Sequence, residues 1–355
     1  MKSVVVVGPT PPPEGGMASQ CATLVRMLRS EGVDARHLST SPALRASLAR
    51  IPGVRTVART AAFWGCLGPA FRDADVVHVL GASYLYFFLC TAPAVRSARR
   101  HGKRVVLNYR GGAAREFFAR WPGAVARVAA MADAVIVPSS FLVDVFARLG
   151  VEARVVPNVL DVDRFRFRQR APLQPRLLVA RNLEPIYDVD TALRAAARVR
   201  ARRPGVTVTC AGDGSLRAEL ERTAARIGLD RVRFAGSVPH AEMPALYDGA
   251  DIVLNPSTVD NSPNSVLEAL AAGAPVVSTD VGGVRHIVRH EESALLVPPG
   301  VPDAMADAVE RLLDDPALAT RLAEGGRRAV DGFAWPALRE PLYRAYGWHE
   351  DPCHA

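Results

Sequence analysis

Short apolar runs alternate with longer amphipathic stretches along the first half of the chain. The stretch "SQCATLVRMLRSEG" has the spacing of apolar positions that is typical of a helix. The runs around it are rich in β-branched residues and apolar almost throughout: "SVVVVG", "VVHVL", "RVVLN", "AVIVPS" and "ARVVPN". Strands of this kind are buried on both faces, so the pattern predicts a parallel sheet covered by helices and an α/β fold class.

The alternation stops after Asn158 and starts again at Arg176. The segment between them, "VLDVDRFRFRQRAPLQP", is charged and shows no sustained period, as is typical of a linker. The second series of apolar runs is "RLLVA", "VTVTCAG", "VRFAG", "DIVLNPS", "APVVST" and "SALLVPPG". A second α/β domain is therefore predicted, and the chain is long enough for two separate cores.

The predicted domains comprise residues 1–165 and residues 166–335. The remaining segment, residues 336–355, follows a long helical region and contains two prolines, and we expect it to form a last helix that crosses back to the first domain. Ligands of open α/β sheets bind at the carboxyl ends of the strands. Candidate site residues are therefore those that directly follow the apolar runs.

The net charge of +8 comes almost entirely from arginine, because Lys2 and Lys103 are the only lysines. The arginines are scattered along the chain, and there is no basic block or patch interleaved with aromatic residues. The charge therefore does not predict nucleic-acid binding. Acidic substrates and anionic lipid both remain compatible with it.

The cysteines point to a reducing compartment, which we expect to be the cytoplasm. They are odd in number, widely spaced and without a C-x-x-C pair, which argues against a disulfide framework or a zinc site. They are Cys21, Cys66, Cys90, Cys210 and Cys353. The apolar stretches "TAAFWGCLGPAF" and "ASYLYFFLCTAPAV" fall short of the roughly 20 apolar residues of a spanning helix, so we expect no transmembrane segment.

Gly15 and Gly16 follow the first apolar run in "GPTPPPEGGMAS" and open a helix. Glycines leave the backbone free to approach a ligand, and a helix N-terminus offers unpaired N–H groups to an anion. An ordinary flexible connection explains the same residues equally well. The dinucleotide-binding pattern G-x-G-x-x-G is missing here.

Arg181 follows the first apolar run of the second domain, on the expected ligand side. Its guanidinium can hold a diphosphate through two hydrogen bonds, and the alternative is a surface or domain-contact residue. The stretch "AGDGSL", which begins at Ala211, suits a plain strand-to-helix turn.

Asp260 and Glu268 lie in "DNSPNSVLEALAAG", a polar loop that leads into an apolar helix. Ser262 or Asn264 can cap this helix, so that Glu268 lies one turn in. Glu268 can favour the helix dipole or accept hydrogen bonds from both hydroxyls of a ribose. A glycoside hydrolase needs two carboxyl groups roughly 5 to 9.5 Å apart, whereas eight residues would rise about 12 Å if both carboxylates were on one helix. The pair fits recognition of two parts of one ligand better than hydrolysis, although the loop position of Asp260 leaves the distance open.

The order of these motifs resembles the retaining glycosyltransferase family 4, whose GT-B architecture has two Rossmann-like domains that face each other across a cleft. The resemblance covers essentially the whole chain and is most specific from Arg176 to Pro299, where "DNSPNSVLE" and "ALAAGAPVVSTDVGG" match the donor-site pattern. The segments "VVPNVLDVDRF" and "GFAW" resemble the interdomain segment and the C-terminal crossover.

The resemblance implies a donor-site role for each matching residue. Glu268 would bind the nucleotide ribose, Asp260 the hydroxyls of the donor sugar, and Arg181 the diphosphate. The remaining residues would contact the donor partly through backbone groups: Ser262, Pro263, Asn264 and Ser265 along the sugar and diphosphate, Gly236 to Val238 beside the base, and Gly15 and Gly16 in a glycine loop over the diphosphate.

Three residues depart from the family pattern. Asp260 stands where a glutamate is frequent, which keeps the charge but shortens the side chain by one methylene. Tyr187 stands where a lysine usually supports the diphosphate. Arg110, after "RVVLN", stands where many relatives have a histidine near the reacting carbon. An arginine cannot act as a general base, but it can stabilise a leaving diphosphate.

The function implied by the resemblance is hexosyl transfer, with retention, from a nucleoside diphosphate sugar to a glycan or lipid-linked acceptor in cell-surface polysaccharide or lipid-linked glycan assembly. No metal or other cofactor is expected, since no D-x-D motif occurs in a suitable loop. The alternatives are a nucleotide-sugar epimerase of the same fold and a non-catalytic partner protein that has kept the fold.

Two apolar segments leave a membrane question open. Phe63 to Phe71 and Tyr84 to Phe88 are flanked by arginines and can meet a lipid-linked acceptor as a peripheral contact at the inner face of the membrane. Equally, both can be core helices of the first domain.

Overall fold

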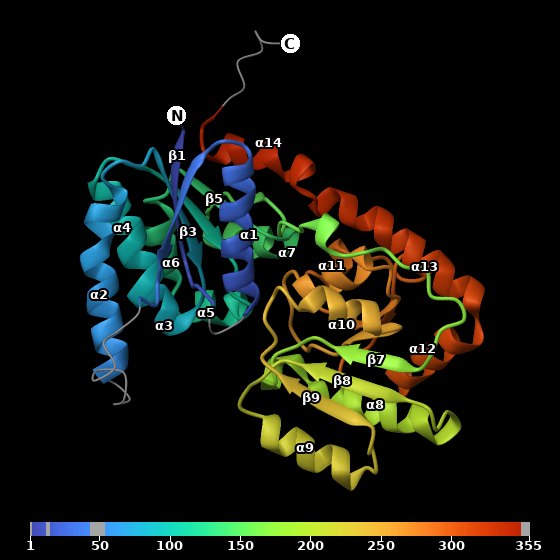
Figure 1. The fold of residues 1–355 in the computed structure, drawn as a ribbon. Helices are drawn as coiled ribbons and strands as arrows, with labels where there is room; N and C mark the ends of the chain where they lie inside the picture. The colour runs from blue at the N-terminus through green and yellow to red at the C-terminus, as the bar shows by residue number, and fades with distance from the viewer. Residues whose placement is uncertain (1, 12–14, 43–53, 349–355) are drawn as a thin grey trace, which may run out of the picture. The chain divides into compact units, whose positions relative to one another are not determined.

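The computed structural model describes residues 2–11, 15–42 and 54–348. The chain divides into two compact units, which Figure 1 shows as ribbons. The first unit contains Met1–Val159 together with Trp335–Ala355, and the second contains Leu160–Ala334. The charged segment after Asn158 therefore belongs to the second unit. It is not a loose linker, because its Phe165 and Arg170 side chains are buried.

The first unit is built on a six-stranded sheet whose paired strands are all parallel, in the order β2-β1-β3-β4-β5-β6. Its strands are β1 (Ser3–Gly8), β2 (Asp34–Ser39), β3 (Val76–Gly81), β4 (Arg104–Tyr109), β5 (Ala134–Val137) and β6 (Arg154–Val155). The predicted α/β class is confirmed. The sequence pattern did not indicate β2, an edge strand of mostly polar residues.

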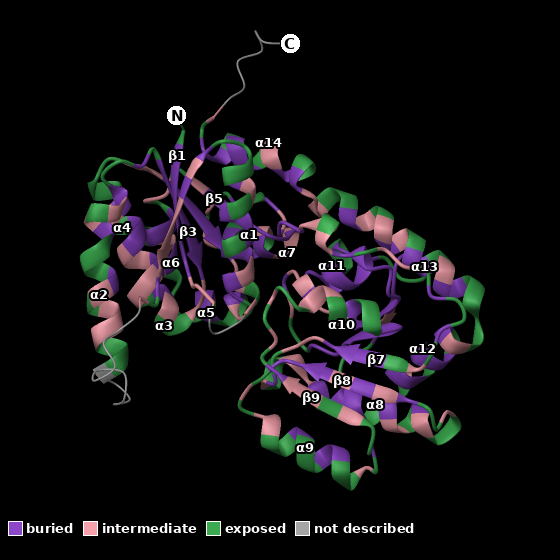
Figure 2. Ribbon diagram, in the orientation of Figure 1, coloured by how far each residue is buried: buried purple, intermediate pink, exposed green. Residues whose placement is uncertain are grey.

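Helices cover both faces of this sheet. They are α1 (Gly16–Ser30), α2 (Val54–Phe71), α3 (Tyr84–Tyr86), the π-helix η1 (Phe87–Thr91), α4 (Ala92–Arg100), α5 (Ala114–Arg120), α6 (Pro122–Ala129), α7 (Ser140–Ala147) and α14 (Trp335–Ala345). Val4 and Val6 of β1 pack in one apolar cluster with α1 and α14, whereas Val5 and Val7 pack in another with α2 and α4. Figure 2 shows the resulting buried strands between half-exposed helices.

The last helix, α14, packs onto the first unit. The hydroxyl of Tyr346, just after the helix, lies 2.8 Å from Nδ1 of His78 on β3, and Trp335 donates to Glu31 over 2.9 Å. Burial lowers the pKa of His78 to about 3, so this imidazole is neutral. The helix is shorter than the predicted 336–355 and continues through Pro341. Cys353 lies outside the described residues.

The second unit contains another six-stranded sheet of parallel pairs, in the order β12-β11-β10-β7-β8-β9. Its strands are β7 (Arg176–Val179), β8 (Thr207–Ala211), β9 (Val232–Gly236), β10 (Ile252–Asn255), β11 (Val276–Thr279) and β12 (Leu295–Val297). The chain runs outward from β7 to β9 and then returns to β10 on the other side of β7. The strand order therefore switches between β7 and β10, which is where open α/β sheets bind ligands.

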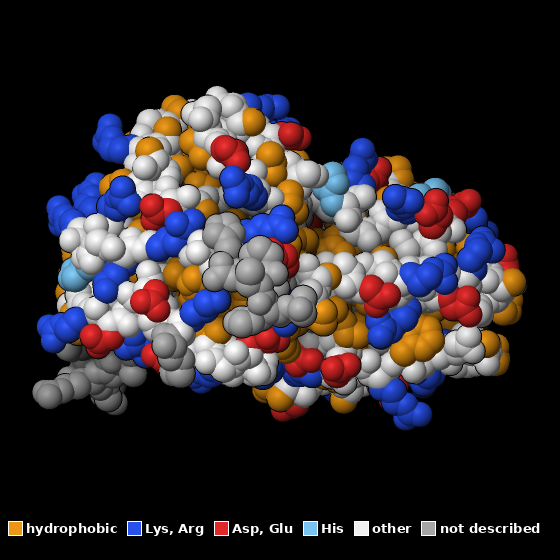
Figure 3. All heavy atoms as spheres, turned by 90° about the horizontal axis from the view of Figure 1, so that it is seen from above, with side chains coloured by type: hydrophobic (Ala, Val, Ile, Leu, Met, Phe, Trp, Pro, Cys, Tyr) orange, Lys and Arg blue, Asp and Glu red, His pale blue; other side chains and the backbone are white. Residues whose placement is uncertain are grey.

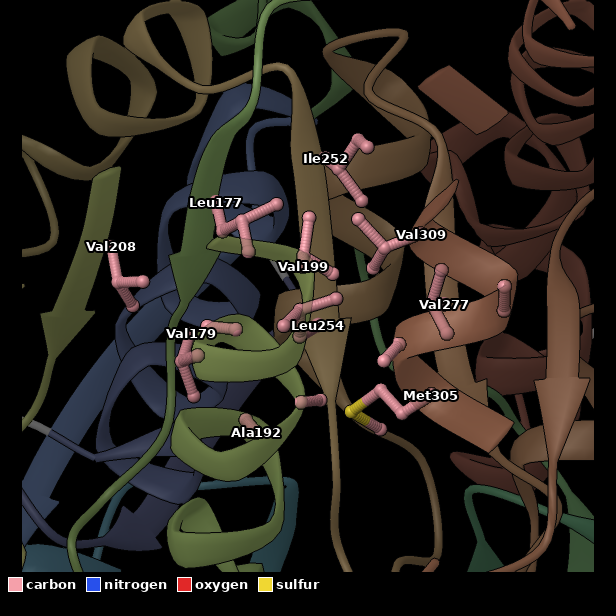
Figure 4. Packing of buried hydrophobic residues seen from close by; sticks show 14 of the residues in the cluster. Leu177, Val179, Ala192, Val199, Val208, Ile252, Leu254, Val277, Met305 and Val309 are labelled. Atoms are coloured by element: carbon pink, nitrogen blue, oxygen red, sulfur yellow. The ribbon is translucent and has the colours of Figure 1, made fainter. Parts of the chain in front are cut away.

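The helices of the second unit also cover both faces of its sheet. They are α8 (Val189–Arg202), α9 (Arg217–Arg226), α10 (Met243–Gly249), α11 (Asn264–Ala271), α12 (Pro302–Asp314) and α13 (Pro316–Ala329), with 3-10 turns η2 (Val162–Arg164), η3 (Pro185–Tyr187), η4 (Val284–His286) and η5 (Val330–Phe333). Leu177 and Val179 of β7 pack against α8 and α12, as Figure 4 shows, whereas Leu178 joins the cluster of α10 and α11.

Charged side chains of both signs are interspersed on the face of the molecule seen in Figure 3. Within the described residues, no helix combines the length and the apolar character needed to cross a membrane. The described cysteines, Cys21, Cys66, Cys90 and Cys210, are free thiols.

Candidate functional site

Arg181 and Asp260 meet in the second unit. Arg181 follows β7, and Asp260 lies in the loop between β10 and α11, so the switch point of the sheet brings them together. Nη2 of Arg181 forms an ion pair with Oδ2 of Asp260, and the two side chains are only 10% and 11% exposed. The candidate cation and the first candidate carboxylate are thus one buried unit.

Asn255 and Ser257 hold this ion pair from the end of β10. Nε of Arg181 donates to Oδ1 of Asn255 over 2.8 Å, and the Ser257 hydroxyl donates to the same oxygen over 2.9 Å. The Ser257 hydroxyl also lies 3.4 Å from Oδ2 of Asp260. Neither residue was predicted from the sequence, although polar side chains at the end of the buried run "DIVLNPS" were an available signal.

Tyr187 lies over the guanidinium of Arg181. The Cζ atom of Arg181 is 4.9 Å from the centre of the Tyr187 ring, within the range of a cation–π interaction. Burial lowers the pKa of Arg181, and the nearby Tyr187, Tyr247 and Glu268 oppose that shift. Tyr187 therefore supports the cation through its ring.

Two glycines allow loops to pass close to the ion pair. Gly282 has a φ of +52°, and a Cβ there would overlap the carbonyl oxygen of Asp260, which accepts from the Gly283 N–H over 2.8 Å. Gly212 has a φ of +152°, and its Cβ would overlap the carbonyl oxygen of Arg181. The interpretation of "AGDGSL" as a plain turn was therefore incomplete, because this turn packs against the backbone of Arg181.

Glu268 lies one turn into α11, as predicted, and its side chain is almost fully buried. One carboxylate oxygen is 3.9 Å from Nδ1 of His240, and Tyr247 on α10 also lies beside it. Burial raises the pKa of Glu268 to about 7, while the Tyr247 hydroxyl and the charges of Arg164 and Arg181 act in the opposite direction. A carboxylate placed only to favour a helix dipole would not need this depth.

The start of α11 differs from the prediction that Ser262 or Asn264 caps it. Pro263 is the N-cap residue, with extended backbone, and no side chain caps the helix. The Ser265 hydroxyl is buried without a hydrogen-bond partner. The four residues from Ser262 to Ser265 therefore lead into and begin α11, the helix that carries Glu268.

Gly236 and Val238 lie at and just beyond the end of β9. The carbonyl of Gly236 accepts from the N–H of Gly212, the glycine that packs behind Arg181, over 2.8 Å. Val238 packs at the edge of the apolar cluster that contains Tyr247. Gly236 is therefore connected to Arg181 through Gly212, and Val238 is connected to Glu268 through the cluster that contains Tyr247.

The raised pKa of Glu268 has a consequence for stability. Its pKa is about 7 in the folded protein against an ordinary value of 4.5, so the folded state binds the extra proton between these pH values. We expect the free energy of unfolding to fall as pH rises from about 4.5 to about 7, with the contribution complete below that window. Urea unfolding across this range should show a weaker pH dependence for Glu268→Gln, and an identical slope in both proteins would contradict the assignment.

Gly15, Gly16 and Arg110 belong to the first unit. Gly15 is the N-cap of α1 with a φ of −178°, which any residue can adopt, and a Cβ there would meet open space. The local fold therefore does not require this glycine. Residues 12–14 of the same loop lie outside the described residues. Arg110 directly follows β4, and its guanidinium donates to Oδ1 of Asn158.

No metal-binding cluster of three or more His, Cys, Asp or Glu side chains occurs in the part of the chain that the structure describes.

Two family models match the chain. The model described as "Glycosyl transferases group 1" matches residues 174–315, which include Arg181, Asp260 and Glu268, and the model described as "Glycosyltransferase Family 4" matches residues 14–164. The chain belongs to glycosyltransferase family 4, group 1. The predicted family is thereby confirmed.

Curated relatives share about a third of their aligned residues with this chain. Glycogen synthase of Mycobacterium tuberculosis is 33% identical over 199 residues, covering 55% of this chain and 48% of the relative. D-inositol 3-phosphate glycosyltransferase of Salinispora tropica is 37% identical over 175 residues, covering 46% and 36%. Phosphatidyl-myo-inositol mannosyltransferase of M. tuberculosis is 33% identical over 211 residues, covering 56% and 54%. The chain spans about half the length of these relatives, or less.

Solved structures share the fold over nearly the whole chain. Anabaena HepE in complex with UDP-glucose superposes with a TM-score of 0.75 and 16% identity, covering 98% of this chain and 100% of HepE. Sucrose-phosphate synthase from Thermosynechococcus elongatus has a TM-score of 0.78 and 20% identity, covering 98% of both chains. The predicted GT-B fold is confirmed.

Proposed function

We propose that this protein is a retaining glycosyltransferase that moves a sugar from a nucleoside diphosphate sugar to a glycan or lipid-linked acceptor. The observation that carries the proposal is the buried group of Arg181, Asp260 and Glu268 inside the matched segment 174–315. A cation beside two carboxylates suits a ligand that combines a diphosphate with sugar hydroxyls. The UDP-glucose complex of HepE and the transferase names of the relatives support the same chemistry.

Each site residue has a proposed role. Arg181 binds the diphosphate, Asp260 the hydroxyls of the donor sugar, and Glu268 the ribose hydroxyls. The other contacts to the donor are assigned to Ser262, Pro263, Asn264 and Ser265 along the sugar and diphosphate, to Gly236 and Val238 beside the base, and to Gly15 and Gly16 at the diphosphate.

The proposed reaction proceeds with retention and without a metal. The bond between the sugar and the diphosphate breaks, the acceptor hydroxyl attacks the same face of the sugar, and an oxygen of the departing diphosphate takes the hydroxyl proton. The enzyme must stabilise the negative charge that develops on the departing diphosphate. The positively charged guanidinium of Arg181 provides this stabilisation. Activity that disappears with EDTA and returns with manganese would contradict metal independence.

Binding of the donor is tested by a thermal-shift screen of nucleoside diphosphate sugars. At least one donor is expected to raise the melting temperature of the wild-type protein and to have no such effect on Arg181→Met. Product analysis with a panel of acceptors then separates transfer from epimerisation, which needs the donor alone. A melting temperature unchanged by every donor would contradict the proposed donor site.

Tyr187→Leu is expected to lower kcat/KM about tenfold, because the ring that supports Arg181 is lost and a cation–π contact is worth about 1 to 2 kcal/mol when it is buried. Tyr187→Phe keeps the ring and should stay within about twofold of wild type. Steady-state kinetics in wild-type and Arg181→Lys backgrounds measure the coupling between the two side chains. Full additivity of the two changes would show that Tyr187 does not act through Arg181.

The acceptor is proposed to be presented at the cytoplasmic face of a membrane, because the first unit has an exposed aromatic surface. This aromatic surface consists of Trp64, Tyr84, Leu85, Phe88 and Trp121, which are 38% to 63% exposed. It is continuous, since the rings of Phe88 and Trp121 lie 5.4 Å apart and Trp64 donates to the Leu89 carbonyl beside them over 2.8 Å. The core alternative holds for Phe63, Phe71 and Phe87 of these segments, which are buried.

The arginines beside the aromatic surface suit anionic headgroups. Arg115, Arg120 and Arg127 are exposed on α5 and α6, on either side of Trp121. Tryptophan and tyrosine favour the membrane interface, and each nearby basic residue adds about 1 kcal/mol on anionic lipid. Wild type should co-sediment with vesicles that contain phosphatidylglycerol, whereas Leu85→Glu should not and the control Val301→Glu, in the second unit, should. Equal sedimentation of all three would contradict membrane contact.

A further inference from the structure

Arg110 lies at the carboxyl edge of the first unit's sheet, and among the described residues it has no counter-ion. Its guanidinium donates to Oδ1 of Asn158, a neutral amide, and its Nε is buried without a hydrogen-bond partner. No carboxylate in the described part of the chain forms an ion pair with it. Burial lowers the pKa of Arg110 to about 10. Arg110 as a whole is only partly buried, but holding even part of a charge out of water is unfavourable, and no carboxylate of the described residues offsets that cost.

The titratable groups around Arg110 do not supply the missing negative charge. Burial raises the pKa of the Cys21 thiol to about 12, so this thiol is neutral. His78 is neutral as well, because burial lowers its pKa to about 3. Both side chains lie close enough for the charge of Arg110 to act on their pKa values. Neither of these two described groups therefore brings a negative charge to Arg110.

Ser139 adds a second unsatisfied group on the neighbouring strand. Asn108 of β4 pairs with Ile136 of β5, so Arg110 comes level with the residue before Ser139. Ser139 is 3% exposed, and its hydroxyl has no hydrogen-bond partner. It is also the N-cap of α7 without capping this helix through its side chain. A helix N-terminus carries a partial positive charge and favours an anion.

We propose that Arg110, Ser139 and the N-terminus of α7 form a phosphate-binding site within the first unit. The guanidinium and the serine hydroxyl donate to phosphate oxygens, and the helix dipole adds to the attraction. The phosphoryl group comes either from a phosphorylated acceptor or from the donor diphosphate, and the chemistry of recognition is the same for both. The site rests on the partly buried guanidinium of Arg110 and the buried hydroxyl of Ser139, and it does not depend on the proposed roles of Arg181, Asp260 and Glu268.

Titration calorimetry and thermal shift with inorganic phosphate, pyrophosphate and glucose 1-phosphate test the site on the full chain. Wild type should gain melting temperature with at least one of these anions, as a ligand of the folded state must. Arg110→Met should lose that gain, and Ser139→Ala should weaken the anion severalfold. Arg110→Lys keeps the charge and should retain part of the response. The matched control is Arg100→Met, which removes an exposed arginine of α4 and should respond as wild type does.

The melting temperature without anion gives an independent readout. Removing the partly buried charge should leave the melting temperature of Arg110→Met unchanged or higher, whereas loss of a structural arginine would lower it. An equal anion response in Arg110→Met and Arg100→Met would overturn the site, as would the absence of any response in wild type.

Two further measurements identify the source of the phosphoryl group. If Arg110→Met binds nucleoside diphosphate sugars as wild type does, the site takes the phosphate of the acceptor, and phosphorylated acceptors should outperform their dephosphorylated counterparts only in wild type. If donor affinity falls tenfold or more together with anion affinity, the site takes the donor diphosphate. An anion response that depends on Arg110, without any response to donors, would support the site and contradict the proposed function.

Discussion

Asp260→Asn is expected to lower kcat about 100-fold while it leaves the dissociation constant of the nucleoside diphosphate within about threefold of wild type. The change keeps the size of the side chain and removes the charge that pairs with Arg181 and that is proposed to accept hydrogen bonds from the sugar hydroxyls. The nucleotide itself lacks the sugar that Asp260 is proposed to contact. Steady-state kinetics and calorimetry with the nucleoside diphosphate alone separate the two effects.

Glu268→Gln is the matched comparison for Asp260→Asn. It also exchanges a buried carboxylate for an amide in the same unit, but its expected effect is on nucleotide affinity, which should weaken about tenfold because the ribose loses a charged acceptor. Two variants with the same pattern of kinetic and binding changes would contradict the separate roles of sugar and ribose recognition.

The sequence predicts most of this fold because the strands are buried on both faces. An apolar run such as "VVVV" between Ser3 and Gly8 has no plausible place except inside a parallel sheet, and all the described strands other than β2 have such a run. β2 was not predicted because it lies at the edge and has one buried residue in "DARHLS". Its identity as a strand comes from pairing with β1, which is a tertiary interaction.

The candidate site could be located from the sequence but not assembled from it. Arg181 and Asp260 each follow a strand, which places them at the carboxyl edge of the sheet. Their contact depends on β10 returning beside β7, and the amino-acid pattern does not contain the order of the strands. The stacking of Tyr187 on Arg181 was missed for a related reason, since the turn η3 sets it.

The burial of Glu268 supports one of the two interpretations that its position left open, the proposed role in ribose binding. A helix-dipole carboxylate is favourable when it is exposed in the first turn, and the expected effect is a few tenths of a kcal/mol to about 1 kcal/mol. Glu268 is instead enclosed by Tyr247 and lies beside His240, at a cost that is visible in its raised pKa. Such strain is typical of a ligand-binding group, and the chemistry of ribose recognition explains it better than helix stability does.

Arg170→Met is expected to destabilise the second unit by about 3 kcal/mol or more, since several buried carbonyl groups lose their donor at once. The Arg170 guanidinium donates to the carbonyl oxygens of Tyr247, Ala250 and Ala272 over 2.6 to 2.8 Å. These carbonyls lie at the C-terminal ends of α10 and α11, where a cation also favours the helix dipoles. Thermal unfolding should show a melting temperature about 10 °C lower.

The control for Arg170→Met is Arg231→Met, which removes the same charge from an exposed position of the same unit and should unfold as wild type does. Because α10 and α11 carry Tyr247 and Glu268, Arg170→Met should also weaken nucleotide binding below the unfolding transition. If Arg170→Met is destabilised but binds the nucleotide with full affinity, α10 and α11 keep the site in place without this arginine. An unchanged melting temperature would contradict the structural role of Arg170. The segment after Asn158 has the sequence pattern of a linker. We expect it to have a structural role as well, because Arg170 joins the C-terminal ends of α10 and α11 through its hydrogen bonds.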